Sequence, residues 1–428
     1  MPRTQSIDRQ ILAIAWPAIL SNITTPLLGL VDTAIAGHLG SAAALAAIAL
    51  GSTVFNLIYW LFGFLRMATG GLTSQAFGAG DAEAQSVVLR RSLLMAAAFG
   101  AVLICLSPVV GGPALRLLDA DDAAGPMAKK YFDLLIWGAP AVLATYSLNG
   151  WLIGMQNTRL PMLIALMTNV LNIGATSIFV FALHMKIEGI ALGTLISQWA
   201  AAVVCLLGVL HKYSPVKVSF MSLSKGLSSM MSINADIFLR TLCMVGVTAW
   251  FTRAGASQGV EVLAANALLM QLFLFFSYFS DGFAYSGEAL AGKFYGAGDC
   301  ENLKISVHRL FRWGGAVAIV FTAAYFLFGE WILTVLTDRN EVVATAREFL
   351  PWAVSIPLCG IMAFIYDGIF IGLTLTRKML MSVAAGMAVF FAIYFGLQGV
   401  MANHALWLAF IAYLLVRGIS LHFFLKHC

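Results

Sequence analysis

The chain has 428 residues, of which 61% are hydrophobic and only 11% are charged. Soluble domains are closer to half apolar and a quarter charged, so this composition excludes a water-soluble globule, a coiled coil and a disordered chain. The net charge is +5, and the basic residues are spread through short polar segments, which argues against a nucleic-acid-binding surface. The composition is that of an all-α polytopic membrane protein.

Long apolar segments separated by short polar breaks follow one another along the whole chain. They are about twice as long as the strands of a membrane barrel, and their residues do not alternate between apolar and polar. A helix of about 20 residues crosses the hydrocarbon core of a bilayer. The sequence therefore predicts twelve transmembrane helices, at about 10–36, 45–72, 92–112, 131–154, 161–183, 188–210, 231–253, 262–289, 313–335, 349–374, 379–400 and 405–425.

The basic residues of the loops predict the orientation of these spans. If the N-terminus lies in the cytoplasm, the cytoplasmic loops and tails contain 15 Lys and Arg residues and the opposite side contains 7. Lys and Arg accumulate in cytoplasmic loops. We therefore expect a multi-pass protein of the cell inner (cytoplasmic) membrane with both termini in the cytoplasm.

The two halves of the chain resemble each other. Residues 45–81 align without gaps on residues 263–299 with 11 identities in 37 positions, and both segments end in GAGD. The same offset of 218 aligns GWLIGMQNTR at 150–159 with GIFIGLTLTR at 368–377, and the GxxxG spacing in both predicts close helix packing. Six spans lie in each half, so both copies cross the membrane in the same direction and the internal repeat is parallel.

This repeat predicts the domain organisation. We expect two six-helix lobes, at 1–210 and 227–428, joined by a polar cytoplasmic linker at 211–226. Two such lobes facing each other across a central cavity form a transporter that works by alternating access.

Charged side chains inside the spans are costly, so each of them is a candidate for function. Asp32 lies in LLGLVDTAIAG without a base nearby, and the equivalent position of the second half is Val247. A carboxylate that has lost its hydration can exchange protons near neutral pH. The alternative is a structural acid that accepts hydrogen bonds from hydroxyls such as those of Thr24, Thr25 or Thr33.

Two further features of the first half concern the same region. A polar patch in the fifth and sixth spans could bind a hard cation, hold the aspartate in a network, or only join helices. The patch consists of Asn169, Asn172, Thr176, Thr194 and Gln198. Pro26 lies six residues before Asp32 and removes a backbone hydrogen bond, so it is either a hinge or a static bend.

The second half has its own embedded charges. Asp236 and Arg240 are four residues apart, and we expect them to form an ion pair within one helix. Asp281 and Glu288 lie two turns apart on one helix face, and Asp367 falls in FIYDGIFIG of the tenth span. Each of these residues could instead line the substrate cavity.

Several motifs are absent from the sequence. It contains no nucleotide-binding GxxxxGK[ST], no HExxH and no CxxC. We therefore expect no ATP motor, no enzymatic activity, no cofactor and no bound metal. The energy for transport would come from an ion gradient.

The segments SNITTPLLGLVDTAIAGHLG (21–40), GLTSQAFGAGD (71–81), NVLNI (169–173) and DGIFIG (367–372) resemble the multidrug and toxic compound extrusion (MATE) family, most closely its DinF-like branch. The resemblance covers essentially the whole chain. It implies two six-helix lobes and a secondary exporter that exchanges protons or sodium ions for organic, often cationic compounds.

The resemblance also assigns roles to residues. It implies that Asp32 couples ions, that Asn172, Thr176 and Thr194 occupy the cation site of the first lobe, and that Asp367 matches an acid that the NorM-like branch uses. Relatives often have an aspartate where this chain has Thr176. That departure favours proton coupling over sodium coupling.

We expect a monomeric secondary active exporter of amphipathic, cationic organic compounds, coupled to inward movement of a proton in preference to sodium. Its partners would be small organic substrates and the lipid bilayer, without nucleic acid. One alternative is a flippase for a lipid or a lipid-linked oligosaccharide, which the excess of five embedded acids over three bases disfavours. Another is an intramembrane enzyme, for which the sequence offers neither a nucleophile–base pair nor a metal-ligand set.

Overall fold

The computed structural model describes residues 6–37, 42–117, 124–216, 222–223 and 226–426. Within these ranges almost every residue is helical and none is in a strand. Eleven helical segments of the described residues are long and apolar enough to cross a membrane. The helix α1, Ile7–Gly37, has 31 residues and corresponds to the first of the predicted spans. The prediction of an all-α polytopic membrane protein is confirmed.

The chain divides into two compact units. One, here called the N unit, consists of Leu20–Met230, and the other, the C unit, consists of Met1–Ile19 and Met231–Cys428. The boundary between the units therefore falls inside α1. The repeat predicts that residues 1–19 belong to the first lobe, whereas in the structure they pack with the second half of the chain.

Polar contacts explain why the start of α1 belongs to the C unit. The Ser286 hydroxyl donates a hydrogen bond to the backbone oxygen of Ile11 at 2.9 Å. The carboxylate of Asp8 accepts a hydrogen bond from the indole of Trp313 at 3.0 Å and forms an ion pair with Arg309 at 3.2 Å. The first turns of α1 are therefore held by side chains that lie 275 and 305 residues later in the sequence.

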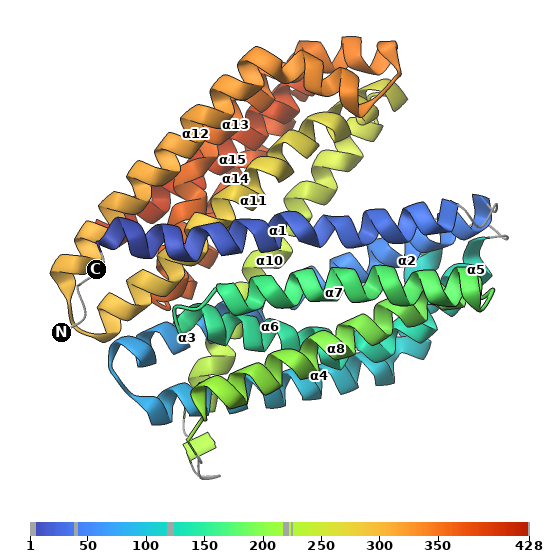
Figure 1. The fold of residues 1–428 in the computed structure, drawn as a ribbon. Coiled ribbons are helices and arrows are strands. Elements are labelled where there is room, and N and C mark those ends of the chain that lie inside the picture. The colour runs from blue at the N-terminus through green and yellow to red at the C-terminus, as the bar shows by residue number, and fades with distance from the viewer. Residues whose placement is uncertain (1–5, 38–41, 118–123, 217–221, 224–225, 427–428) are drawn as a thin grey trace. The chain divides into compact units, whose positions relative to one another are not determined.

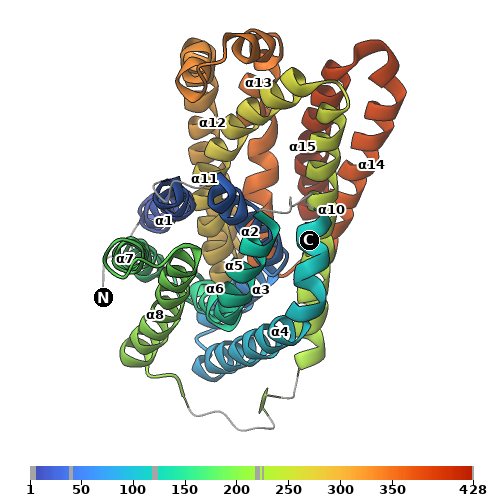
Figure 2. The same ribbon diagram turned by 90° about the vertical axis from the view of Figure 1, so that its right-hand side faces the viewer.

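The N unit contains the second part of α1 and the helices of the first repeat (Figure 2). Two of the predicted spans are broken, because α2 and α3 share one span and α5, η1 and α6 share another. The helices are α2 (Ala42–Leu61), α3 (Phe64–Gly78), α4 (Ala82–Leu117), α5 (Ala124–Leu135), η1 (Ile136–Gly138), α6 (Ala139–Gly154), α7 (Arg159–Ser177), the π-helical turn η2 (Ile178–Ala182) and α8 (Ile187–Tyr213). The helices α7 and α8 pack side by side, as do α3 and α6.

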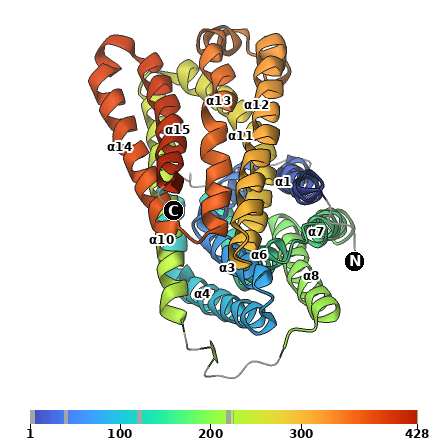
Figure 3. The same ribbon diagram turned by 90° about the vertical axis from the view of Figure 1, so that its left-hand side faces the viewer.

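Besides the start of α1, the described residues of the C unit form six helices. They are α10 (Leu227–Ala256), α11 (Val260–Gly296), α12 (Cys300–Leu336), α13 (Asn340–Gly372), α14 (Thr376–Met401) and α15 (Asn403–Lys426). Figure 1 shows α12 running along α13, and Figure 3 shows α14 beside α15. Aromatic rings join α10 to its neighbours, because Trp250 contacts Phe391 of α14 and Phe251 contacts Trp407 of α15.

The two copies of the GAGD sequence adopt the same local structure. Gly80 and Gly298 both have a φ of +70°, a conformation that glycine adopts without a steric penalty. The carboxylates of Asp81 and Asp299 then each accept a hydrogen bond from the backbone N–H three residues later, at 2.8 and 3.0 Å. Each aspartate therefore caps the helix that follows, α4 in one unit and α12 in the other.

Close backbone approaches also repeat at the offset of 218. A Cβ atom on Gly150 would collide with the backbone oxygen of Arg66, and a Cβ atom on Gly368 would collide with that of Ala284. Both members of each pair are 218 positions from their equivalents in the other unit. The predicted close packing of the GxxxG segments is confirmed, with α6 against α3 and α13 against α11.

Candidate functional site

Asp32 lies in α1, on the part of the helix that belongs to the N unit, and it is only 4% exposed. The hydroxyl of Thr194, from α8, donates a hydrogen bond to Asp32 Oδ2 at 3.1 Å. The side-chain amide of Asn172, from α7, in turn donates to the Thr194 hydroxyl oxygen at 2.9 Å. A chain of two hydrogen bonds therefore connects α8 and α7 to one buried carboxylate on α1.

In the described part of the chain, the second oxygen of the same carboxylate lacks such a hydrogen bond. Among the described residues, Asp32 Oδ1 has no hydrogen-bond partner. The hydroxyls of Thr24 and Thr33 donate instead to backbone oxygens of α1, those of Ser21 at 2.9 Å and Gly29 at 2.7 Å. The alternative that these two threonines satisfy Asp32 is therefore wrong. Thr25 has a side chain outside the described residues.

The rest of the polar patch lies in the same unit but not in this hydrogen-bond chain. Thr176 is fully buried, and within the described part of the chain its hydroxyl oxygen and Asn172 Oδ1 have no partner. Asn169 donates a hydrogen bond to the backbone oxygen of Thr24 at 2.9 Å, so it joins α7 to α1. Gln198 packs against Gly138 at the start of α6. Of the five patch residues, the structure brings Asn172 and Thr194 together with Asp32.

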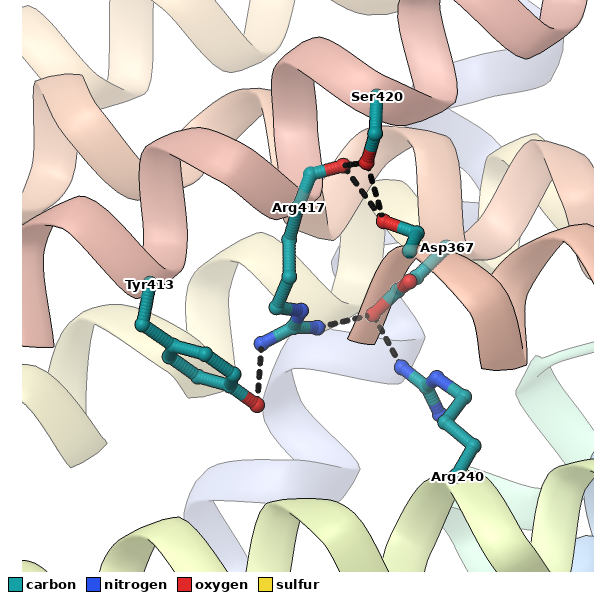
Figure 4. Close-up of polar contacts among 6 residues, drawn as sticks. Arg240, Asp367, Tyr413, Arg417 and Ser420 are labelled. Carbon is teal, nitrogen blue, oxygen red and sulfur yellow. Dashed lines mark hydrogen bonds and ion pairs between the residues drawn. The ribbon is translucent and has the colours of Figure 1, made fainter. Parts of the chain in front are cut away.

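In the C unit, two buried arginines converge on one carboxylate (Figure 4). Asp367 Oδ2, on α13, accepts a hydrogen bond from Arg417 of α15 at 2.7 Å and another from Arg240 of α10. The Tyr413 hydroxyl lies 3.5 Å from the Arg417 guanidinium. This arrangement contains two positive charges and one negative charge.

The expected ion pair between Asp236 and Arg240 within α10 is wrong. Asp236 Oδ2 accepts a hydrogen bond from Thr376 at 3.0 Å, and Asp236 Oδ1 pairs with Arg377 at 3.5 Å. Arg240 pairs with Asp367 instead. Helical spacing brings two side chains onto one face, but here each of them has a partner on another helix.

The remaining candidates have simpler placements. Glu288 is fully buried in α11 and Asp281 is half-buried in the same helix, and neither takes part in the ion pairs of Asp367. Pro26 lies within α1, with its side chain outside the described residues.

Arg417 and Tyr413 are the two members of the C-unit cluster that are not among the site residues predicted from the sequence. Arg417 is an arginine within an apolar span, which was the available signal, because such a charge is costly without a partner. Tyr413 precedes it by four residues and so lies on the same helix face. An aromatic residue in an apolar span carries no comparable signal.

The chain matches known proteins over almost its full length. The MatE family model matches residues 17–178 and again residues 237–396, once in each repeat. DNA damage-inducible protein F of Escherichia coli (strain K12) is 37% identical over 420 residues, which cover 97% of this chain and 91% of that protein. Protein DETOXIFICATION 44, chloroplastic, of Arabidopsis thaliana is 27% identical, with 87% of this chain and 73% of that protein covered.

Solved structures share the fold at lower sequence identity. The Vibrio cholerae MATE transporter VcmN in its bent form superposes with a TM-score of 0.90 at 18% identity, covering 99% of this chain and 97% of that one. A MATE protein in the bent conformation superposes with a TM-score of 0.88 at 17% identity, covering 99% and 95%. The two-lobe prediction is thereby confirmed. The chain belongs to the MatE family of multidrug efflux transporters and is a multi-pass membrane transporter, not an enzyme.

Proposed function

We propose that the chain exports amphipathic organic compounds, cationic ones among them, by alternating access, and that inward movement of protons through Asp32 drives this export. The observation that supports the proposal is the environment of the carboxylate. One oxygen accepts a hydrogen bond from Thr194, while the other has no partner among the described residues. A proton on the second oxygen would leave the hydrogen bond to the first in place.

Protonation of Asp32 changes the energy of the buried site. An ionised carboxylate costs several kcal/mol to bury, and adding a proton removes that cost. A difference of ~5.5 kcal/mol between two conformations is enough to shift their populations from 1:99 to 99:1. If Asp32 is buried in one conformation and hydrated in the other, it binds a proton outside the cell and releases it inside.

Sodium is the second candidate for the coupling ion. Three buried oxygens, Asp32 Oδ1, Asn172 Oδ1 and the Thr176 hydroxyl, have no hydrogen-bond partner among the described residues, and such oxygens are ligands for hard cations. Only one of the three belongs to a charged group. A proton needs one oxygen and a sodium ion needs several, so we place proton coupling first.

Efflux from proteoliposomes distinguishes these ions. A pH gradient without sodium should drive export by the wild-type protein, and a sodium gradient without a pH gradient should not. Asp32→Asn keeps the shape of the side chain but cannot titrate, so we expect it to fold and to lose pH-driven export. Undiminished pH-driven export by Asp32→Asn would contradict the role of Asp32, and sodium-driven export by the wild type would favour the second candidate.

The proposal includes a location and a topology. The excess of basic residues on one side, 15 against 7, supports cytoplasmic termini in the cell inner membrane. We propose that the protein acts there as a monomer, with small organic molecules and lipid as its partners. A lipid or lipid-linked oligosaccharide as the transported molecule is the alternative within the same fold.

A further inference from the structure

The cluster of Arg240, Asp367 and Arg417 has one positive charge more than its partners balance. Both guanidinium groups donate to the same oxygen, Asp367 Oδ2, while Asp367 Oδ1 has no partner among the described residues. The nearest acid in α10, Asp236, is already paired with Arg377. The arginine side chains are only 4% exposed, so water contributes little to stabilising the unbalanced positive charge.

The arginines also have unused hydrogen-bond donors. Within the described part of the chain, the Nε atoms of Arg240 and Arg417 are buried and have no acceptor. A guanidinium presents five N–H donors in a planar fork that matches the two oxygens of a carboxylate, sulfonate or phosphate. An anion would accept hydrogen bonds from the Nε–H donors and would also balance the excess positive charge.

We propose that Arg240 and Arg417 bind the acidic group of an amphipathic organic anion, so that the C unit recognises a second class of substrate. This inference rests on the proposed export function and names a charge class that Asp32 would not attract. With a carboxylate or sulfonate bound, the two positive charges of Arg240 and Arg417 are balanced by two negative charges, that of Asp367 and that of the ligand. The aromatic residues of α10, α14 and α15 provide apolar surface in the same unit.

Asp367 acts in this proposal as an internal competitor for the arginines. Its side chain is 11% exposed, against 4% for either arginine, and we place the approach of the anion beside it as part of the proposal. The anion and the Asp367 carboxylate then share the same donors. Removal of the Asp367 charge should therefore strengthen anion binding, whereas removal of either arginine should weaken it.

Equilibrium binding to the purified full-length protein in a neutral detergent tests these opposite signs. The probes are naphthalenesulfonate and naphthylmethylammonium, which share an aromatic ring system and differ in charge. We expect Arg240→Gln and Arg417→Gln each to weaken naphthalenesulfonate binding about tenfold or more, and Asp367→Asn to tighten it by about the same factor. Arg339→Gln, at an exposed arginine directly before α13, the helix of Asp367, is the matched control and should leave binding unchanged. Naphthylmethylammonium binding should be the same in all four variants.

Two results would overturn the proposal. One is naphthalenesulfonate binding that Asp367→Asn leaves unchanged or weakens, since a purely structural ion pair predicts no gain. The other is an equal loss of naphthalenesulfonate binding in Arg339→Gln and Arg417→Gln. If an arginine variant does not fold, Asp367→Asn still decides the question.

A lipid phosphate is a second source of the same chemistry. Nanodiscs made of phosphatidylcholine, with and without phosphatidylglycerol, separate the two. Competition by phosphatidylglycerol against naphthalenesulfonate would assign the site to a lipid headgroup and overturn the soluble substrate, whereas equal binding in both supports it. No gradient is imposed, so failure here is distinct from failure of proton coupling at Asp32.

Discussion

Thr194 is the side chain that we expect to set the proton affinity of Asp32. Its hydroxyl donates to Asp32 Oδ2 at 3.1 Å and accepts from Asn172 at 2.9 Å, and all three residues are buried. Thr194→Val keeps the shape of the side chain and removes both hydrogen bonds. A hydrogen bond to a charged group contributes about 1.5–3 kcal/mol. The ionised form of Asp32 loses that stabilisation in the variant, and the protonated form loses less.

The sign and size of the effect follow from this difference. Weaker stabilisation of the ionised form means that proton release requires a higher pH, and one pH unit corresponds to about 1.36 kcal/mol. We therefore expect the internal pH of half-maximal efflux to rise by about one to two units in Thr194→Val. The assay is efflux from proteoliposomes at a constant pH difference and stepped internal pH.

Two variants control for the loss of a hydroxyl as such. Thr194→Ser keeps the donor and should reproduce the wild-type profile. Thr168→Val removes a hydroxyl that bonds only to the backbone oxygen of Ile164 in α7, so its profile should also be unchanged. A Thr194→Val profile that coincides with the wild type, or that moves to lower pH, would refute the assignment of Thr194.

Further predictions concern the hinge, the topology and the repeat. Pro26→Ala restores a backbone N–H to α1 and should reduce efflux severalfold at matched expression. Drug resistance at the wild-type level in this variant would show that Pro26 produces only a static bend. Ala82→Cys and the native exposed Cys300, which occupy equivalent positions after the two GAGD loops, should react with an impermeant maleimide only after the cells are permeabilised. Labelling of either in intact cells would reverse the proposed orientation. Gly368→Ala should lower thermal stability in detergent by about 1–3 kcal/mol because its Cβ collides with backbone, while Gly246→Ala, with open space around it, should not. Equal stability of the two variants would contradict the close packing of α13 on α11.

The hydropathy of the sequence predicts the membrane spans but not the breaks and extensions of the helices. The predicted span at 45–72 is interrupted in the structure, since α2 ends at Leu61 and α3 begins at Phe64. A break of two residues leaves the average hydropathy unchanged. The predicted span at 92–112 is part of α4, Ala82–Leu117, because a helix continues into its polar first turns outside the apolar segment. Hydropathy measures the apolar segment, and hydrogen bonds decide where the helix ends.

The energetic cost of burying a charge identifies the charged residues of the candidate site but not their partners. Asp32 was found because a carboxylate in an apolar span needs a reason to be there. Its partner could not be chosen from sequence, since Thr24 and Thr33 are closer along the chain than Thr194. In the structure those two hydroxyls bond to backbone oxygens of their own helix, which are always within reach.

Long-range pairing explains what the sequence did not reveal in the C unit. The spacing of Asp236 and Arg240 fits an ion pair within one helix, yet Arg240 pairs with Asp367, 127 residues later. Arg417 reaches the same oxygen from α15. No periodicity along the chain shows which of several helices brings the strongest partner. Charge counts over whole spans also missed this cluster, because five acids and three bases in total conceal a local excess of positive charge.

Proton movement driven by a substrate gradient tests the central claim most directly. Proteoliposomes that contain a pH-sensitive dye and no pH gradient are diluted so that an amphipathic cation flows out through the transporter. Coupled exchange through Asp32 predicts that the wild-type protein moves protons in the opposite direction and acidifies the lumen, and that Asp32→Asn moves none. Equal acidification by Asp32→Asn, or substrate flow through the wild type without any proton movement, would contradict the account.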